Sequence, residues 1–186
     1  MRVLAIETST LAGGVALLDD GRVVAEYALD VAVTHSERVM AAVDSLVHDA
    51  RWHPRDLQGL AVAVGPGSFT GLRIGLATAK GLALALDLPI AAVPTLDAMA
   101  AMLPFAAWPV CPVIAARKNE VYACLYRATP DGMQREWDYL ALTPEMLGER
   151  LVEPTILVGD GATRIASVHA RVAPAVPRIP SAAALV

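Results

Sequence analysis

A glycine-rich segment at residues 65–75 joins a strand pattern to a helix pattern, and it constrains the fold more than any other feature of the chain. It reads Gly-Pro-Gly-Ser-Phe-Thr-Gly-Leu-Arg-Ile-Gly. The apolar, β-branched residues 60–64 before it are typical of a strand inside a sheet, and the residues from Thr70 onward have helical composition. Glycine-rich turns between a strand and a helix often bind anions, so this segment is a candidate phosphate site.

The spacing of the segment fits neither of two well-known phosphate loops. A dinucleotide fingerprint needs its third glycine at position 70, where Thr70 stands. A P-loop needs Lys and then Ser or Thr after its second glycine, yet Gly71 is followed by Leu72 and Arg73. Pro66 also lacks the N–H that a phosphate nest would use. A structural turn and a generic anion site at the helix N-terminus both stay open, and the anion site would consist of Gly67, Ser68, Thr70, Gly71 and Arg73.

The helix that follows carries small residues in two rows with a four-residue repeat. The first row is Gly71, Gly75, Ala79 and Ala83, and the second is Ala77, Gly81 and Ala85. Rows of this kind let another backbone approach closely. We expect one row to pack on the protein's own sheet. The second row either packs internally as well or meets a partner.

Four segments of the chain together resemble the TsaB family, also called YeaZ. They are residues 65–81, the N-terminal Leu-Ala-Ile-Glu-Thr-Ser-Thr at 4–10, Thr-His-Ser-Glu at 34–37 and Glu-Val-Tyr at 120–122. The resemblance runs over nearly the whole chain. It implies an α/β fold of the actin-like, Hsp70-like and sugar-kinase-like class, with two lobes of mixed sheets flanked by helices and a reduced second lobe.

The resemblance also implies a function without catalysis. In that family TsaB binds and supports TsaD, the metal-carrying transferase that forms threonylcarbamoyladenosine beside the anticodon of tRNA, and an ATPase, TsaE, joins the complex. The chain would then need no metal or cofactor of its own, would meet tRNA only within the complex, and would pair with itself when TsaD is absent. The partner-binding residues carried over by the resemblance are Val39, Met40, Val43, Ile74, Ala77, Thr78 and Gly81.

The patterns along the chain predict two lobes, residues 1–103 and 104–186. Strands are expected at residues 2–6, 14–18, 22–28, 60–64, 89–93, 113–115, 121–127, 134–142 and 155–158. Helices are expected at residues 35–51 with Thr34 or Ser36 as cap, from 70, at 95–102 with Thr95 as cap, from Thr143 and at 163–169. Residues 180–186 begin like a capped helix and stop after one turn, so the second lobe is expected to lack a terminal helix.

Catalytic candidates are few. Glu7 stands where the resemblance to actin-like enzymes places a metal-organising Asp, and it either holds magnesium through water or is simply a solvated strand end. A nucleotide-binding or hydrolysing enzyme that uses Glu7 and residues 65–71 is therefore the alternative function, and a homodimeric regulator is a third. None of the histidines has zinc-site spacing, and they are His35, His48, His53 and His169.

Composition limits the partners and the compartment. The net charge of −4 provides no broad basic field for unaided tRNA binding. Cys111 and Cys124 are predicted to be reduced core thiols. No signal peptide is visible, and prolines interrupt the uncharged run at residues 98–116, so we expect a cytoplasmic protein without a membrane helix.

Overall fold

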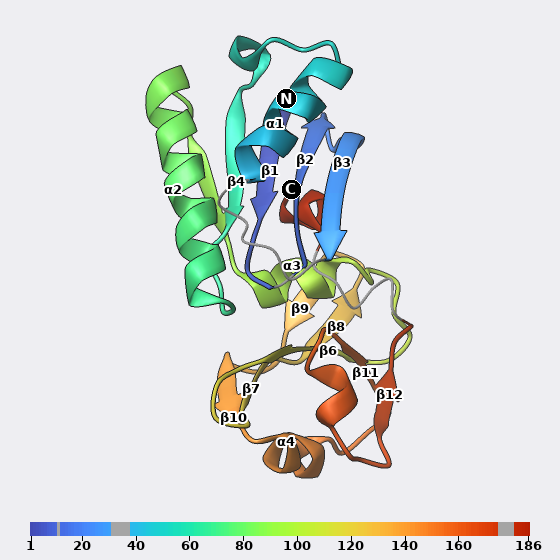
Figure 1. Cartoon of the computed structure of the whole chain (residues 1–186). Helices are drawn as coiled ribbons and strands as arrows, with labels where there is room; N and C mark the ends of the chain where they lie inside the picture. Colours follow the sequence, from blue (N-terminus) through green and yellow to red (C-terminus); the bar gives the residue numbers. More distant parts are fainter. Residues whose placement is uncertain (11, 31–37, 175–180) are drawn as a thin grey trace. The chain divides into compact units, whose positions relative to one another are not determined.

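The chain forms two compact units in a computed structural model (Figure 1). Unit 1 contains Met1–Thr95 and Ser181–Val186, and unit 2 contains Leu96–Pro180. The structure describes residues 1–10, 12–30, 38–174 and 181–186.

The division falls earlier than the boundary predicted after residue 103. Helix α3 (Thr95–Ala101) lies almost entirely in unit 2, because its side chains Leu96 and Met99 are buried in that unit's core together with Val110 and Ile114. The last residues of the chain belong to unit 1. Residue order alone had placed α3 in the first lobe and the last residues of the chain in the second. Packing of apolar side chains places each of them in the other unit.

Unit 1 is built on a five-stranded sheet in the order β3-β2-β1-β4-β5. Strand β2 is antiparallel to both of its neighbours, β1 and β3, whereas β4 and β5 run parallel to β1. Asp20 and Gly21 both have positive φ, 48° and 77°, as the tight hairpin predicted between β2 and β3 requires. The strands are β1 (Arg2–Glu7), β2 (Ala12–Asp19), β3 (Arg22–Asp30), β4 (Gly59–Ala63) and β5 (Ile90–Val93).

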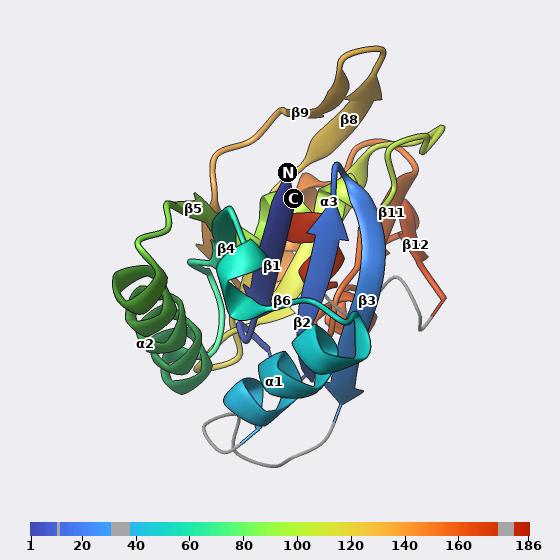
Figure 2. The same cartoon turned by 90° about the horizontal axis from the view of Figure 1, so that it is seen from above.

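Helices α1 (Val39–Asp49) and α2 (Phe69–Leu86) lie on the same side of this sheet (Figure 2). Leu4, Ile6 and Leu60 on the strands are buried against them. A 3-10 turn, η2 (Pro54–Asp56), precedes β4. By length and composition alone α2, with mean hydropathy 1.2, is apolar enough to cross a membrane, but one of its faces packs on the sheet.

The predicted start of the first helix falls partly outside the described residues. Residues 35–37 and both cap candidates, Thr34 and Ser36, lie there. In the described part the helix begins at Val39, after Arg38, whose side chain makes no capping hydrogen bond.

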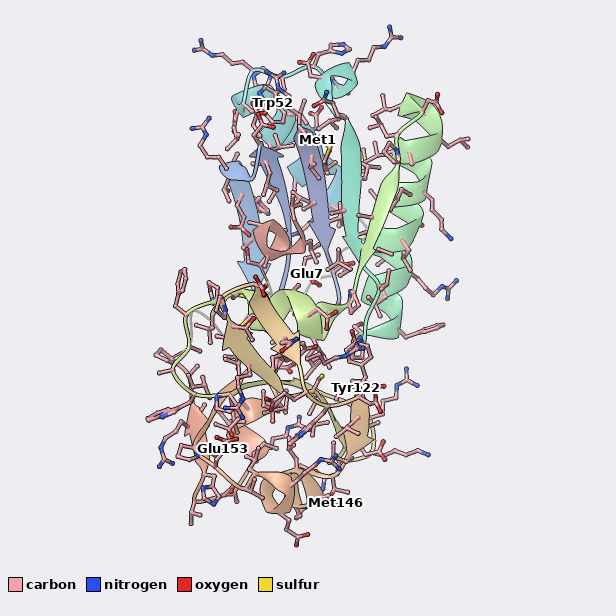
Figure 3. All side chains as sticks on the ribbon, turned by 180° about the vertical axis from the view of Figure 1, so that it is seen from behind. Met1, Glu7, Trp52, Tyr122, Met146 and Glu153 are labelled. Carbon is pink, nitrogen blue, oxygen red and sulfur yellow. The ribbon has the colours of Figure 1, made fainter. Side chains whose placement is uncertain are left out.

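The end of the chain packs on the other face of the unit 1 sheet. Figure 3 shows a 3-10 turn, η5 (Ala182–Leu185), in front of the strands, and it contacts β1 and β2. Ser181 caps this turn by accepting a hydrogen bond from the Ala183 N–H at 3.2 Å, and its hydroxyl donates to Glu26 at 2.5 Å. The capped turn predicted from the sequence is therefore confirmed, and the contacts that stabilise it come from strands in unit 1.

Unit 2 contains a seven-stranded sheet within its described residues. Its main path is β10-β7-β6-β11-β12, and the hairpin of β8 and β9 joins it through β6. The strands are short, three to six residues each. The predicted reduction of the second lobe therefore lies in the length of its strands, because its sheet has more strands than the sheet of unit 1. They are β6 (Val110–Ala115), β7 (Val121–Ala123), β8 (Tyr126–Thr129), β9 (Gly132–Arg135), β10 (Leu140–Leu142), β11 (Thr155–Val158) and β12 (Ala170–Val172).

Sequence patterns in unit 2 predicted element types better than element lengths. Each of the strands predicted at 121–127 and 134–142 is in fact two strands, because the chain changes pairing partner within it: β7 and β10 pair with each other, and β8 pairs with β9. Strand β12 was not predicted. The helix α4 (Pro144–Arg150) has Thr143 as its cap and Pro144 at its first position, as predicted.

The prediction that Thr95 caps α3 is wrong. Thr95 is the first residue within the helix, and its buried hydroxyl has no hydrogen-bond partner among the described residues.

Cys111 and Cys124 are free and buried, as predicted, and burial raises the pKa of the Cys111 thiol to about 12.

A carboxylate on α3 holds two tyrosine hydroxyls of unit 2. Tyr126 and Tyr139 both donate to Asp97, the Tyr139 hydroxyl at 2.8 Å from Oδ1. Burial and the neighbouring carboxylate raise the pKa of Tyr126, so this hydroxyl keeps its proton as a donor. The network ties α3 to β8 and to the segment before β10.

We expect Asp97→Ala to lower the free energy of unfolding of unit 2 by about 1–3 kcal/mol, because it leaves the buried Tyr126 hydroxyl without an acceptor. Urea unfolding followed through Trp108 and Trp137, both in unit 2, measures the change. Asp138→Ala is the control, since Asp138 is exposed and makes no hydrogen bond within the described residues. Equal stability of the two variants would contradict the assignment.

Candidate functional site

The glycine-rich segment packs backbone to backbone on the turn that follows β1. A Cβ at Gly67 would overlap the carbonyl of Ser9, and one at Gly71 would overlap the carbonyl of Thr8. The Ser68 N–H donates to the Ser9 carbonyl at 2.5 Å, and the Thr8 hydroxyl donates to the Gly71 carbonyl at 2.8 Å. Glycine is needed here because the two chain segments approach more closely than any side chain allows.

This packing occupies groups that an anion would need. The Ser68 N–H is bonded to Ser9, and the Gly71 N–H is bonded to the Ser68 hydroxyl at 3.2 Å, which caps α2. Arg73 lies 5.3 Å from the ring centroid of Phe69. Three of the five predicted anion-binding residues, Gly67, Ser68 and Gly71, thus make contacts within the chain. The other two, Thr70 and Arg73, are exposed. Anion binding stays a prediction, and the internal contacts account for the segment without it.

Glu7 is fully buried, at the end of β1 (Figure 3), so the expectation of a solvated strand end is wrong. Its Oε1 accepts a hydrogen bond from the Ser9 N–H at 2.5 Å, whereas Oε2 has no partner among the described residues. Removal from water raises the pKa of this carboxyl, and the Ser9 hydrogen bonds only partly oppose that rise.

No group of three or more His, Cys, Asp or Glu side chains that could hold a metal ion occurs within residues 1–10, 12–30, 38–174 and 181–186. Glu7 would therefore have to bind a cation with hydroxyl and backbone oxygens as its companions. His35 lies outside the described residues.

Glu7→Gln is expected to make the protein more stable at pH 7.5, by about 1 kcal/mol or more, because a buried ionisable group is replaced by a neutral amide. The unfolded chain ionises Glu7 near its ordinary pKa of 4.5, and the folded protein holds that proton to higher pH. Folding stability from Glu7 is therefore lost as the pH rises from about 4.5 through the raised pKa.

Urea unfolding of both proteins at pH 4.5 and at pH 7.5 measures this difference. The advantage of the variant must shrink toward pH 4.5. A variant that is less stable at pH 7.5 would show that the carboxylate is needed in its charged form.

The two small-residue rows of α2 face opposite ways. Gly71, Gly75 and Ala79 are buried against the sheet, whereas Ala77, Gly81 and Ala85 are exposed. The expectation that one row serves the protein's own sheet is confirmed. The outward row forms part of a surface shared with α1, since the two helices contact each other on the same side of the sheet (Figure 2).

An apolar groove of about 230 Å³ runs between α1 and α2. Its α1 side includes Met40, Asp44 and His48. Its floor and its α2 side are apolar, and the remaining lining residues are Leu4, Val43, Val47, Trp52, Pro54, Leu57, Leu82 and Leu86.

The structure divides the seven predicted partner-binding residues into three groups. Val39 and Val43 are buried in the core, because the helical period places them on the same face as Leu46 and Val47, and Val43 also lines the groove. Met40, Ala77 and Gly81 are exposed, and Ile74 and Thr78 are partly buried. Sequence reasoning missed Trp52, Leu82 and Leu86, whose apolar character gave a signal but whose common groove depends on how the two helices pack.

Gly75→Ala and Gly81→Ala should change stability in opposite directions. A Cβ at position 75 overlaps the Thr8 hydroxyl, so this variant loses about 1–3 kcal/mol of unfolding free energy. A Cβ at position 81 meets nothing within 4 Å, so alanine there gains up to about 1 kcal/mol from its higher helix propensity. Thermal unfolding of the matched pair measures both effects, and a destabilised Gly81→Ala protein would show that this position is not open.

Known proteins are similar to this chain in sequence and in fold. A family model described as "TsaD: tRNA N6-adenosine threonylcarbamoyltransferase" matches residues 29–139. The Bacillus subtilis protein named tRNA threonylcarbamoyladenosine biosynthesis protein TsaB is 45% identical over 127 residues, 68% of this chain and 56% of that protein. The Escherichia coli protein of the same name is 38% identical over 167 residues, 87% of this chain and 72% of that protein. The chain thus spans little more than half the length of the Bacillus subtilis protein.

Solved structures of other proteins have the same fold as this chain. YeaZ from Pseudomonas aeruginosa superposes with a TM-score of 0.83 and 30% identity, over 99% of this chain and 88% of that one. An activator of 2-hydroxyisocaproyl-CoA dehydratase from Clostridium difficile, with a TM-score of 0.57 and 11% identity over 100% of this chain and 92% of that one, shares the fold alone. The fold is therefore of the actin-like, Hsp70-like and sugar-kinase-like class. Within that class the chain belongs to the TsaB family, also called YeaZ, as its sequence resemblance predicted.

Proposed function

We propose that this chain is a non-catalytic subunit that supports a TsaD transferase in forming threonylcarbamoyladenosine in tRNA. The names of the curated relatives and the family model at residues 29–139 support this pathway. The observation that carries the docking proposal is the exposed small-residue row of α2 beside the apolar groove. A helix of TsaD would lie against this row and insert an aliphatic side chain into the groove. TsaE and tRNA would then join through the complex.

Two features of the glycine-rich segment support a role without catalysis. Its backbone fills the space over the turn after β1, and its Ser68 and Gly71 N–H groups are already bonded within the chain. A phosphate would have to displace these contacts. The 2-hydroxyisocaproyl-CoA dehydratase activator, whose structure contains bound ADPNP, would therefore share the architecture of this chain and not its loop chemistry.

Gly81→Arg is expected to abolish co-elution with TsaD in gel filtration, because a long charged side chain would stand where the backbones must approach closely. The fold should be retained, since nothing lies within 4 Å of a Cβ at this position. Val152→Arg is the matched control, because Val152 is 81% exposed and lies in unit 2. Unchanged co-elution of the Gly81→Arg protein would overturn the docking surface.

A nucleotide-binding enzyme is the second candidate, and it is favoured by the buried Oε2 of Glu7, which has no hydrogen-bond partner among the described residues. Calorimetric titration of the isolated chain with Mg-ATP tests it: micromolar binding that Glu7→Gln removes would support the enzyme, and absence of heat would support the subunit.

A homodimeric regulator is the third candidate. Mass measurement over a range of concentrations, with and without TsaD, distinguishes it from the heteromeric subunit.

A further inference from the structure

The groove between α1 and α2 has one polar border. Its floor and its α2 side are apolar, whereas Asp44 and His48 line it from α1. Residues four positions apart lie on the same side of a helix, so these two polar side chains follow each other along one wall. The groove therefore combines an apolar surface with a carboxylate at its edge.

The Asp44 carboxylate has no partner within the described residues. Its side chain is exposed, and it makes neither an ion pair nor a hydrogen bond there, not even with His48 one turn away. No Lys or Arg of the described part of the chain lines the groove. The negative charge of Asp44 is therefore free to meet a cation that comes from outside the chain.

The basic side chain that contacts a wall of the groove is already paired elsewhere. The Arg2 guanidinium carbon lies 4.6 Å from the centroid of the Trp52 ring, which lines the groove. Its Nε is 3.6 Å from an Asp19 oxygen, and its Nη1 is 3.4 Å from an Asp56 oxygen. Arg2 is thus shared between two carboxylates, and it forms no ion pair with Asp44.

A long basic side chain suits this groove better than a purely aliphatic one. An aliphatic side chain would remove water from the wall that carries Asp44 and would offer its carboxylate no hydrogen bond, which is costly. Arginine and lysine can lay their apolar stems along an apolar surface and keep the charged end at a polar border. Of the two, a guanidinium is the more weakly hydrated and forms paired hydrogen bonds with a carboxylate.

We infer that the groove accepts an arginine side chain of the helix that docks on the α1–α2 face, with its stem against Leu82 and Leu86 and its guanidinium on the Asp44 carboxylate. This inference rests on the proposed docking of TsaD. The aliphatic group proposed to enter the groove is then the stem of this arginine. Asp44 determines specificity, because a docking helix with a carboxylate at the same place would be repelled.

The first test is the affinity for TsaD of the wild-type chain, Asp44→Asn and Asp44→Glu. At about 50 mM salt, where screening is weak, Asp44→Asn should weaken binding by about fivefold or more, and at about 500 mM salt the difference should shrink. Asp44→Glu keeps the carboxylate and should bind more tightly than Asp44→Asn. Asp49→Asn is the matched control, because Asp49 is an exposed residue of α1 that does not line the groove.

Equal affinity of Asp44→Asn and Asp49→Asn for TsaD would overturn the inference. Sedimentation of the same variants without TsaD identifies another source of the cation. If Asp44→Asn weakens self-association and leaves the affinity for TsaD unchanged, the basic side chain comes from a second copy of the chain, and the inference is wrong.

The second test does not need TsaD, so it separates failure of the inference from failure of the proposed function. The probes are n-butylguanidinium, which resembles an arginine side chain, and n-butylurea, which has a similar shape without the charge. Nuclear magnetic resonance follows the methyl groups of Leu82 and Leu86 during titration with each probe. The cation should bind the wild-type chain at least about threefold more tightly than the urea, and Asp44→Asn should remove the difference. Equal affinity of the two probes for the wild-type chain, or binding of neither, would overturn the inference.

Discussion

The contact between the glycine-rich segment and the turn after β1 determines the arrangement of the rest of unit 1. Because Gly67 and Gly71 allow two backbones to touch, α2 starts directly over Thr8 and Ser9. Its buried row then lies on the sheet, and its second row faces outward. The groove beside α1 follows from the same placement, since Leu82 and Leu86 line it from the last turns of α2.

The same contact uses hydrogen-bond donors of the glycine-rich segment within the chain. The Ser68 N–H bonds the Ser9 carbonyl in the turn after β1, and the Gly71 N–H bonds the Ser68 hydroxyl. The carboxyl of Glu7 lies below this layer, out of water, with its pKa raised by burial. Close packing therefore stabilises the lobe at the carboxyl ends of parallel strands, where open sheets of other proteins bind their ligands.

The proposed docking on the α1–α2 face rests on shape. The exposed small residues of α2 would let a partner backbone come near, and the groove would accept an apolar side chain. Shape alone would suit a second copy as well as a different protein.

Local patterns and motifs were enough to predict the strand and helix types of unit 1, the hairpin at Asp20 and Gly21, the cap of α4 and the family of the chain. The burial of Glu7, the place of Val39 and Val43 in the core and the packing of α3 in unit 2 depend instead on contacts between residues distant in the sequence. The rows of α2 show the difference best. Their spacing predicted two faces, but which face meets water depends on the sheet that the helix covers, and that is set by contacts between residues more than 60 positions apart.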